Sequence, residues 1–122
     1  MKINEKDSRP LYLQIQEGLE TGILTGIYLE EEQIPSTTDL SVNFQINPAT
    51  ALKGINGLVD EEILYKKRGI GVFVKKGAVH KIMEKRKKSF KEHYVLPLVK
   101  EAARLQIGEE ELILWIQEMK QK

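Results

Sequence analysis

Residues 46–54 read INPATALKG, and this stretch carries a sharp signal for the start of a helix. The side-chain oxygen of Asn47 can accept a hydrogen bond from a backbone N–H group that has no partner at a helix start. Pro48 suits the first helical position, because its missing N–H is not needed there and its φ angle already fits a helix. The stretch therefore predicts a helix that begins at Pro48.

The two faces of this predicted helix differ in character. The apolar residues recur at helical spacing and are expected to face the core: Ala51, Leu52, Ile55, Leu58 and Val59. The other face is expected to carry small or polar residues: Ala49, Thr50, Lys53, Gly54 and Gly57. Two glycines inside a helix cost about 1 kcal/mol each relative to alanine, so we expect close approach by something at that face. The alternative is a small surface helix with nothing bound to it.

Two further helices are expected before this one. Residues 10–25 form an amphipathic pattern, with a stripe of Tyr12, Ile15, Leu19 and Ile23. In the segment PSTTDL, Ser36 is a natural N-cap and Asp39 stands three residues later, which resembles a capping box and opens a short helix ending at Phe44. Residues 45–46 then form a tight link to Pro48, which indicates a helix-turn-helix.

The periodicity changes after Glu61. Residues 63–74, ILYKKRGIGVFV, read as two short strands around a turn marked by Gly69 and Gly71, with a cationic tip. The predicted fold is therefore mainly α with a small β wing, a winged helix-turn-helix over residues 1–77. Residues 78–122 are expected to form a helical tail, with a kink or break at Pro97 and a helix end at Gly108.

Positive charge is concentrated in one part of the chain. The net charge of all 122 residues is only +1, but residues 65–91 contain 11 basic side chains and 1 acidic side chain. Such a segment is typical of a nucleic-acid footprint, and a solvated lysine-rich helix face is the alternative.

The residues of this N-terminal half resemble the winged-helix domain of GntR transcription regulators. The resemblance is carried by PLYLQI, IPSTTDL, INPATALKGINGLVDEEILY and RGIGVFV, which together span residues 10–74 in the right order. The Asn-Pro-x-Thr start of the third helix and the short tail look most like the YtrA subfamily of small bacterial repressors. The resemblance implies a homodimer on a palindromic double-stranded DNA operator, with the third helix in the major groove and the wing at the minor groove. It also suggests control of the chain's own or a neighbouring operon, often one that encodes a transporter.

The resemblance also assigns DNA contacts to particular residues. They are Ser36 and Thr38 at the second helix, Asn47, Pro48, Ala49, Thr50 and Lys53 at the third, and Lys67, Arg68 and Gly69 in the wing. Thr38 departs from the family, which commonly has arginine there, so we expect weaker anchoring of the DNA backbone at that position. No cofactor is implied, and the 48 residues after the wing are too few for the large effector-binding domains of other GntR branches.

The tail contains more apolar residues than two short helices can bury between them. A second copy of the same tail would cover the excess, so we expect a dimer contact. The residues assigned to it are Leu98, Leu105, Leu112, Trp115, Ile116 and Met119.

Several other functions are disfavoured. The chain has no cysteine, and His80 and His93 are thirteen residues apart without a carboxylate cluster, so neither a disulfide nor a metal site is expected. No nucleophile–base pair or phosphate loop stands out, which argues against an enzyme. No signal peptide or membrane span is recognisable, so a cytoplasmic location is expected. A winged-helix protein-interaction module and a non-specific nucleic-acid binder stay open as alternatives.

Overall fold

The computed structural model of the chain describes residues 3, 4 and 6–122, which fold into two compact units. One unit ends at Glu84, and the other runs from Lys85 to Lys122. The first contains α1 (Leu11–Leu24), α2 (Thr37–Phe44), α3 (Pro48–Asp60), β1 (Leu64–Lys67), β2 (Gly71–Val74) and the start of α4 (Ala78–Phe90). The second contains the end of α4, a π-helical segment η1 (Lys91–Val95), α5 (Leu96–Arg104) and α6 (Glu109–Met119).

The helix-turn-helix is held by the local bonds that the sequence predicts. Ser36 Oγ accepts from the backbone N–H of Asp39 at 3.0 Å, and an Asp39 carboxylate oxygen accepts from Ser36 N at 3.1 Å, which completes a capping box. Between the helices, Gln45 adopts a left-handed conformation, and Ser41 Oγ donates to Ile46 O at 2.7 Å. Asn47 caps α3 and Pro48 occupies its first turn, so both predictions for this helix start are confirmed.

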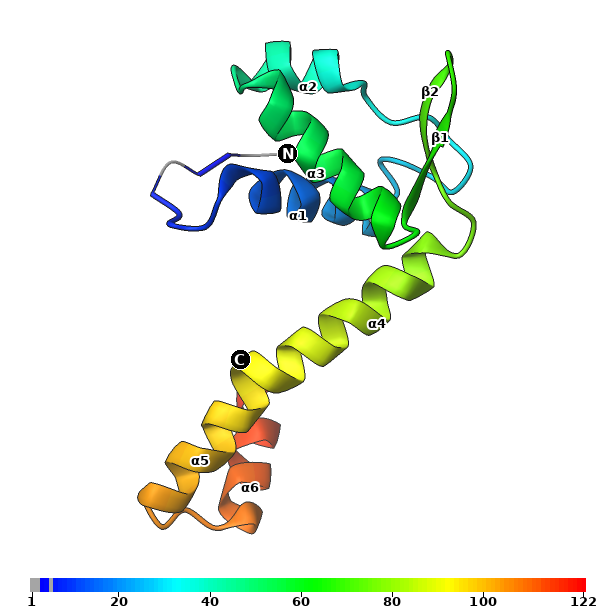
Figure 1. Cartoon of the computed structure of the whole chain (residues 1–122). Helices are drawn as coiled ribbons and strands as arrows, with labels where there is room; N and C mark the ends of the chain where they lie inside the picture. Colours follow the sequence, from blue (N-terminus) through cyan, green and yellow to red (C-terminus); the bar gives the residue numbers. More distant parts are fainter. Residues whose placement is uncertain (1–2, 5) are drawn as a thin grey trace. The chain divides into compact units, whose positions relative to one another are not determined.

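α3 lies across α1, and a glycine allows the two backbones to meet closely (Figure 1). A Cβ atom added to Gly54 would lie 3.1 Å from the carbonyl oxygen of Tyr12 and 3.1 Å from Ile15 Cγ2. Gly57 faces Gln16 of α1, whose Nε2 donates to Gly54 O at 3.1 Å. The expected close approach at these glycines is therefore confirmed, and the approaching element is α1. The assignment of Gly54 to the outer face is wrong, because Gly54 is buried against α1, whereas Gly57 is half-buried and lines a groove with Ala49 and Lys53.

The apolar stripe of α3 is also narrower than expected. Ala51, Ile55 and Leu58 are fully buried, whereas Leu52 is 41% exposed on the outer face of the helix. Its assignment to the core is wrong, because Gly54 rather than Leu52 turns toward α1. The core of the unit joins residues from all its elements: Ile15, Leu19, Ile23, Ile34, Leu40, Ala51, Ile55, Leu58, Ile63, Leu64, Val74, Ala78 and Ile82.

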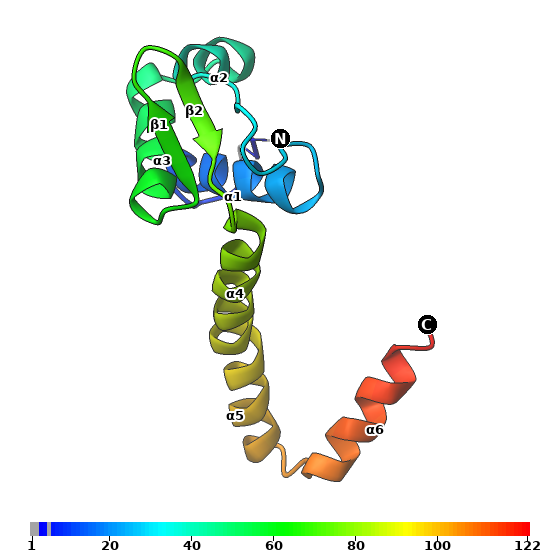
Figure 2. The ribbon, with the colours of Figure 1, turned by 90° about the vertical axis from the view of Figure 1, so that its right-hand side faces the viewer.

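The hairpin is antiparallel and pairs Leu64 with Val74 and Lys67 with Gly71 (Figure 2). The segment before α2 runs beside β2, because Gln33 bridges Phe73 and the backbone N–H of Ile34 donates to Val72 O at 2.9 Å. β2 is thus hydrogen-bonded to β1 along one edge and to the segment before α2 along the other. The mainly helical fold with a small β wing is confirmed.

The start of α4 is capped by a carboxylate that is distant in the sequence. Glu30 accepts from the backbone N–H groups of Gly77 at 2.9 Å and Val79 at 3.0 Å, which satisfies donors that a helix start leaves unpaired. Ala78 and Ile82 are buried in the core of the first unit, which therefore extends seven residues beyond the expected boundary at residue 77.

The second unit departs from the sequence expectation in two details. The interruption near Pro97 takes the form of η1, after which Pro97 lies in the first turn of α5, where its missing N–H is tolerated. α5 ends at Arg104 rather than at Gly108, and Gly108 instead forms the N-cap of α6. Across the part of the chain that the structure describes, none of the helices is long and apolar enough to cross a membrane.

Replacing Gly54 with valine should destabilise the protein, because the added side chain meets the Tyr12 backbone and Ile15. We expect a loss of about 1–3 kcal/mol in the free energy of unfolding, measured by urea denaturation. Gly57→Ala is the matched control, because the added methyl meets only the movable end of Gln16. It should stay within about 1 kcal/mol of the parent. Equal stability of Gly54→Val and the parent would contradict this account of the α1–α3 contact.

Glu30 should contribute a distinct acid-sensitive component to stability. The backbone N–H groups of Gly77 and then Val79 hold the pKa of its carboxyl below the ordinary value. A lowered folded-state pKa gives stability that is present above the unfolded pKa and is lost as pH falls through the folded pKa. Glu30→Gln should therefore melt at a lower temperature than the parent at pH 7, and the gap should close on acidification below about pH 4, as the parent carboxyl becomes protonated. A gap that is unchanged between pH 7 and pH 3 would contradict the role of the carboxylate.

Candidate nucleic-acid interface

The first turns of α3 present a smooth, exposed surface. Asn47 Oδ1 accepts from the backbone N–H of Ala49 at 2.8 Å, which leaves the –NH₂ group of this exposed residue as its side-chain donor. Pro48 and Ala49 are exposed, and Thr50 is half-buried. The small side chains at the helix start leave its backbone open to a flat or concave partner.

Lys53 shares this face and is held in place by an aromatic ring of α1. Its Nζ lies 4.1 Å from the centroid of the Tyr12 ring, which is a cation–π distance. The contact keeps the positive charge of Lys53 beside Ala49 and Leu52, which line the same groove. Lys53 is therefore an exposed cation with a restricted position.

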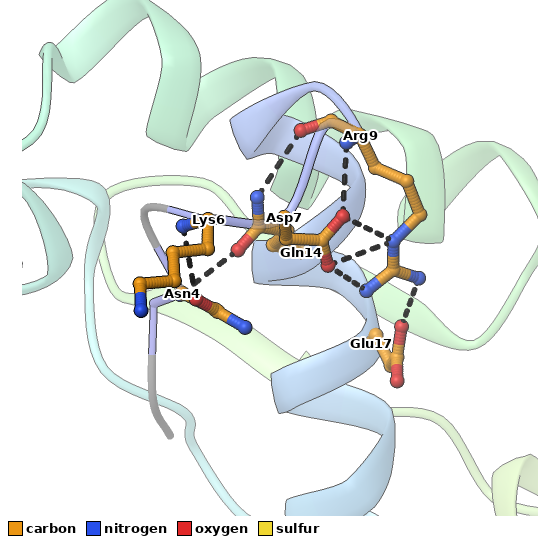
Figure 3. Close-up of polar contacts among 6 residues, drawn as sticks. All are labelled: Asn4, Lys6, Asp7, Arg9, Gln14 and Glu17. Atoms are coloured by element: carbon orange, nitrogen blue, oxygen red, sulfur yellow. Dashed lines mark hydrogen bonds and ion pairs between the residues drawn. The ribbon is translucent and has the colours of Figure 1, made fainter.

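The segment before α1 is clasped to that helix, as Figure 3 shows. The guanidinium of Arg9 donates to both carboxylate oxygens of Asp7, at 3.1, 3.0 and 2.6 Å, and also to Glu17 of α1. The bonds from Arg9 lower the pKa of Asp7. The charge of Arg9 is thus paired within the protein, where it links Asp7 to Glu17 of α1.

Gln14 completes this clasp from inside the fold (Figure 3). Its buried side chain accepts from the backbone N–H of Asn4 at 3.1 Å and donates to Arg9 O at 3.1 Å. Both ends of the amide are therefore satisfied, and the chain that enters α1 is held in place.

The two α2 residues predicted to contact DNA have different surroundings. Ser36 is half-buried and its hydroxyl accepts the capping bond from Asp39 N, so its observed role is to start the helix. Thr38 is exposed in the first turn of α2.

The tip of the wing is cationic and open. Lys67, Arg68, Gly69 and Ile70 are all exposed, and the backbone N–H of Ile70 donates to Lys67 O at 2.9 Å to close the turn. Gly69 has a φ of +77°, a left-handed conformation that favours glycine at this turn. Lys67 Nζ lies 4.4 Å from the ring centroid of Phe73, so this cation folds back over the hairpin and Arg68 is the cation of the turn itself.

Two side-chain contacts join the wing to α3 and to the segment before α2. Lys66 Nζ of β1 donates to Asn56 Oδ1 of α3, and Gln33 Nε2 donates to Ile70 O at 3.2 Å. β1 is thereby bonded to α3, and the wing turn is bonded to the segment before α2. Lys66, Asn56, Gln33 and Tyr12 were not among the predicted site residues, because their contacts join elements far apart in sequence.

The predicted dimer residues gather in the second unit. Leu98 of α5 and four residues of α6 line a groove of about 440 Å³, together with Lys120: Leu112, Trp115, Ile116 and Met119. Leu105, the sixth residue of the set, is exposed outside this groove. Within residues 85–122, all of which the structure describes, Ala102 is the one buried side chain.

Comparison with known proteins identifies the N-terminal half. Residues 11–74, just over half of the chain, match the model of the bacterial regulatory proteins of the gntR family. The chain is 32% identical over 84 residues to the HTH-type transcriptional repressor NagR of Bacillus subtilis, covering 69% of this chain and 35% of that protein. It is 28% identical over 119 residues to the repressor YtrA of the same organism, covering 98% of this chain and 91% of YtrA. The chain thus spans about a third of the first of these relatives and nearly all of the second.

Solved structures agree with this match. A GntR-family regulator from Bacteroides thetaiotaomicron has a TM-score of 0.80 and 34% identity, over 90% of this chain and 96% of that one. The DNA-binding domain of AraR in complex with its operator ORR3 has a TM-score of 0.54 and 30% identity, over 61% of this chain and 89% of that one. The family match covers the capped α2, the exposed α3 and the basic wing described above, and so the chain belongs to the gntR family of bacterial regulatory proteins, a family of DNA-binding transcriptional regulators.

Proposed function

We infer that the chain is a dimeric repressor that binds a palindromic operator, with α3 in the major groove and the wing at the minor groove. The observation that carries this inference is that one unit presents both an exposed α3 start and a cationic wing turn, with β1 bonded to α3 through Lys66 and Asn56. Side chains at the N-terminus of a recognition helix reach base edges, and exposed cations position the phosphate backbone. Repression of its own or a neighbouring operon would accord with its similarity to NagR and YtrA, which are both repressors.

The proposed contacts divide between reading and anchoring. Asn47, Pro48, Ala49, Thr50 and Lys53 supply the surface in the major groove. The wing residues Lys67, Arg68 and Gly69 follow the backbone and the minor groove, and Ser36 and Thr38 approach a phosphate through the start of α2. The excess of positive charge in residues 65–91 would strengthen association with any duplex.

The second unit supplies the proposed dimer contact. Its helices leave a large apolar surface uncovered: Leu98, Leu105, Leu114, Trp115, Ile116 and Met119 are all exposed, and so are Phe90, Tyr94 and Val99. Monomeric proteins seldom expose apolar patches beyond a few hundred Å². A second copy offers the same surface, so a two-fold contact through the groove of Leu98 and Trp115 would bury the apolar surfaces of both copies. The two α3 helices would then meet half-sites about one DNA turn, roughly 34 Å, apart.

Ala49→Glu should abolish specific DNA binding without unfolding the protein. Ala49 is exposed, so the free domain tolerates glutamate, but against DNA the side chain adds bulk and like charge. We expect affinity for a duplex enriched by the full-length chain from a random pool to fall by about 100-fold or more, measured by fluorescence anisotropy.

The matched control is Ala49→Gln, which has nearly the same size and no charge. It should bind more tightly than the glutamate variant, and both variants should melt within a few degrees of the parent. Normal binding by Ala49→Glu would show that α3 is not the reading element.

The dimer contact is tested with charges placed on exposed apolar residues of the tail. Leu98 is 46% exposed and Ile116 is 54% exposed, so the double variant Leu98→Asp, Ile116→Asp should fold as a monomer. It should sediment as a monomer at micromolar concentration and lose about 100-fold in affinity for a two-half-site duplex, because the second half-site no longer binds intramolecularly.

Leu29→Asp is the control, since Leu29 is 56% exposed in the first unit. It should sediment as a dimer. A parent chain that is monomeric at micromolar concentration, or a double variant that still dimerises, would rule out the tail as the dimer contact.

A further inference from the structure

Leu52 is the largest apolar side chain on the outer face of α3. It is 41% exposed, although Ile55, only three residues later, is fully buried. Ala49 lies one turn before Leu52 and Asn56 one turn after it, and all three line a shallow groove of about 430 Å³ beside Tyr12 and Lys53. A single exposed leucine is ordinary, so its meaning depends on what its neighbours can offer to a partner.

The polar neighbours of Leu52 are already engaged inside the protein. Asn56 Oδ1 accepts from Lys66 Nζ, and Asn47 Oδ1 accepts from the backbone N–H of Ala49. An asparagine reads an adenine through both the carbonyl and the –NH₂ group of its amide, and each of these two carbonyls already accepts one hydrogen bond from within the protein. Lys53 is drawn toward the Tyr12 ring. Beside the –NH₂ group of Asn47 and the side chain of Thr50, this surface therefore offers a base edge the methyl groups of Ala49 and Leu52.

The major groove contains one apolar recognition feature, the C5-methyl group of thymine. We propose that Leu52, with Ala49, determines operator specificity by packing against a thymine methyl in each half-site. This inference rests on the proposed function, because it requires α3 to lie in the major groove. It adds a residue to the predicted contacts and names the base that the residue recognises.

Replacing thymine with deoxyuridine tests the proposal directly, because the change removes the C5-methyl group and keeps every hydrogen-bonding group. The probe is the duplex that the full-length chain enriches from a random pool, with each thymine replaced in turn. At one or two positions in a half-site we expect affinity to fall about three- to sixfold, the size expected for one buried methyl group. The methyl lies in the major groove, so contacts from the wing in the minor groove do not contribute to this loss.

The same scan with Leu52→Ala separates direct contact from an effect of the methyl group on DNA shape. The variant should bind the thymine duplex more weakly than the parent does, and it should discriminate between the thymine and deoxyuridine duplexes less than the parent does, because only the Ala49 contact with the methyl group remains. An effect on DNA shape would persist in the variant. Leu29→Ala, which truncates a leucine outside α3, should keep the full sensitivity of the parent.

Three results would overturn the proposal, and they are distinguishable. If no thymine position is sensitive, or if Leu52→Ala keeps the sensitivity of the parent, then Leu52 does not read a methyl group although specific binding stands. If the pool yields no enriched sequence, the proposed function fails and this inference fails with it.

Discussion

The close contact between α3 and α1 at Gly54 is the constraint on which the rest of the first unit depends. At this position the two helices approach until a Cβ atom would lie 3.1 Å from a backbone oxygen. This contact determines the rotation of α3 about its own axis. Ala51, Ile55 and Leu58 consequently face the core, while Ala49, Leu52 and Lys53 face outward. It also places the Tyr12 ring beside Lys53, so the surface proposed to meet DNA is partly built by α1.

The outer surface is ordered by contacts that use up many of its polar groups. Lys66 is bonded to Asn56, Gln33 to the wing turn, and Arg9 to Asp7 and Glu17. Each contact restricts a long side chain before any ligand arrives, which lowers the conformational entropy lost on binding. At the start of α3, the side-chain oxygen of Asn47 is likewise bonded, to the backbone N–H of Ala49. These side chains of the proposed DNA-binding surface are thus restricted before DNA binds.

The parts of the fold that depend on neighbours in sequence could be predicted from the sequence. Asn47 with Pro48, and Ser36 with Asp39, act within one helical turn, so their chemistry is visible in a few letters. The orientation of α3 could not be predicted in the same way. Over thirteen residues a helical pattern fits a stripe containing Leu52 about as well as one containing Gly54, and only the presence of α1 decides between them. The cap by Glu30 depends on a still larger separation in sequence, because Glu30 bonds the backbone of Gly77, 47 residues later, at the start of α4. For the same reason the predicted site residues included the start of α3 and the wing turn but omitted Tyr12, which contacts Lys53, and Asn56 and Lys66, which join α3 to β1.

The central claim is that α3 and the wing form one DNA-binding surface. It is tested most directly by adding the enriched duplex to ¹⁵N-labelled full-length protein and mapping which backbone amides shift in the NMR spectrum. The account predicts that the largest changes cluster at residues 47–53 of α3 and 67–71 of the wing, within one saturating transition. Changes at α3 without changes at the wing, or changes confined to residues 85–122, would contradict it.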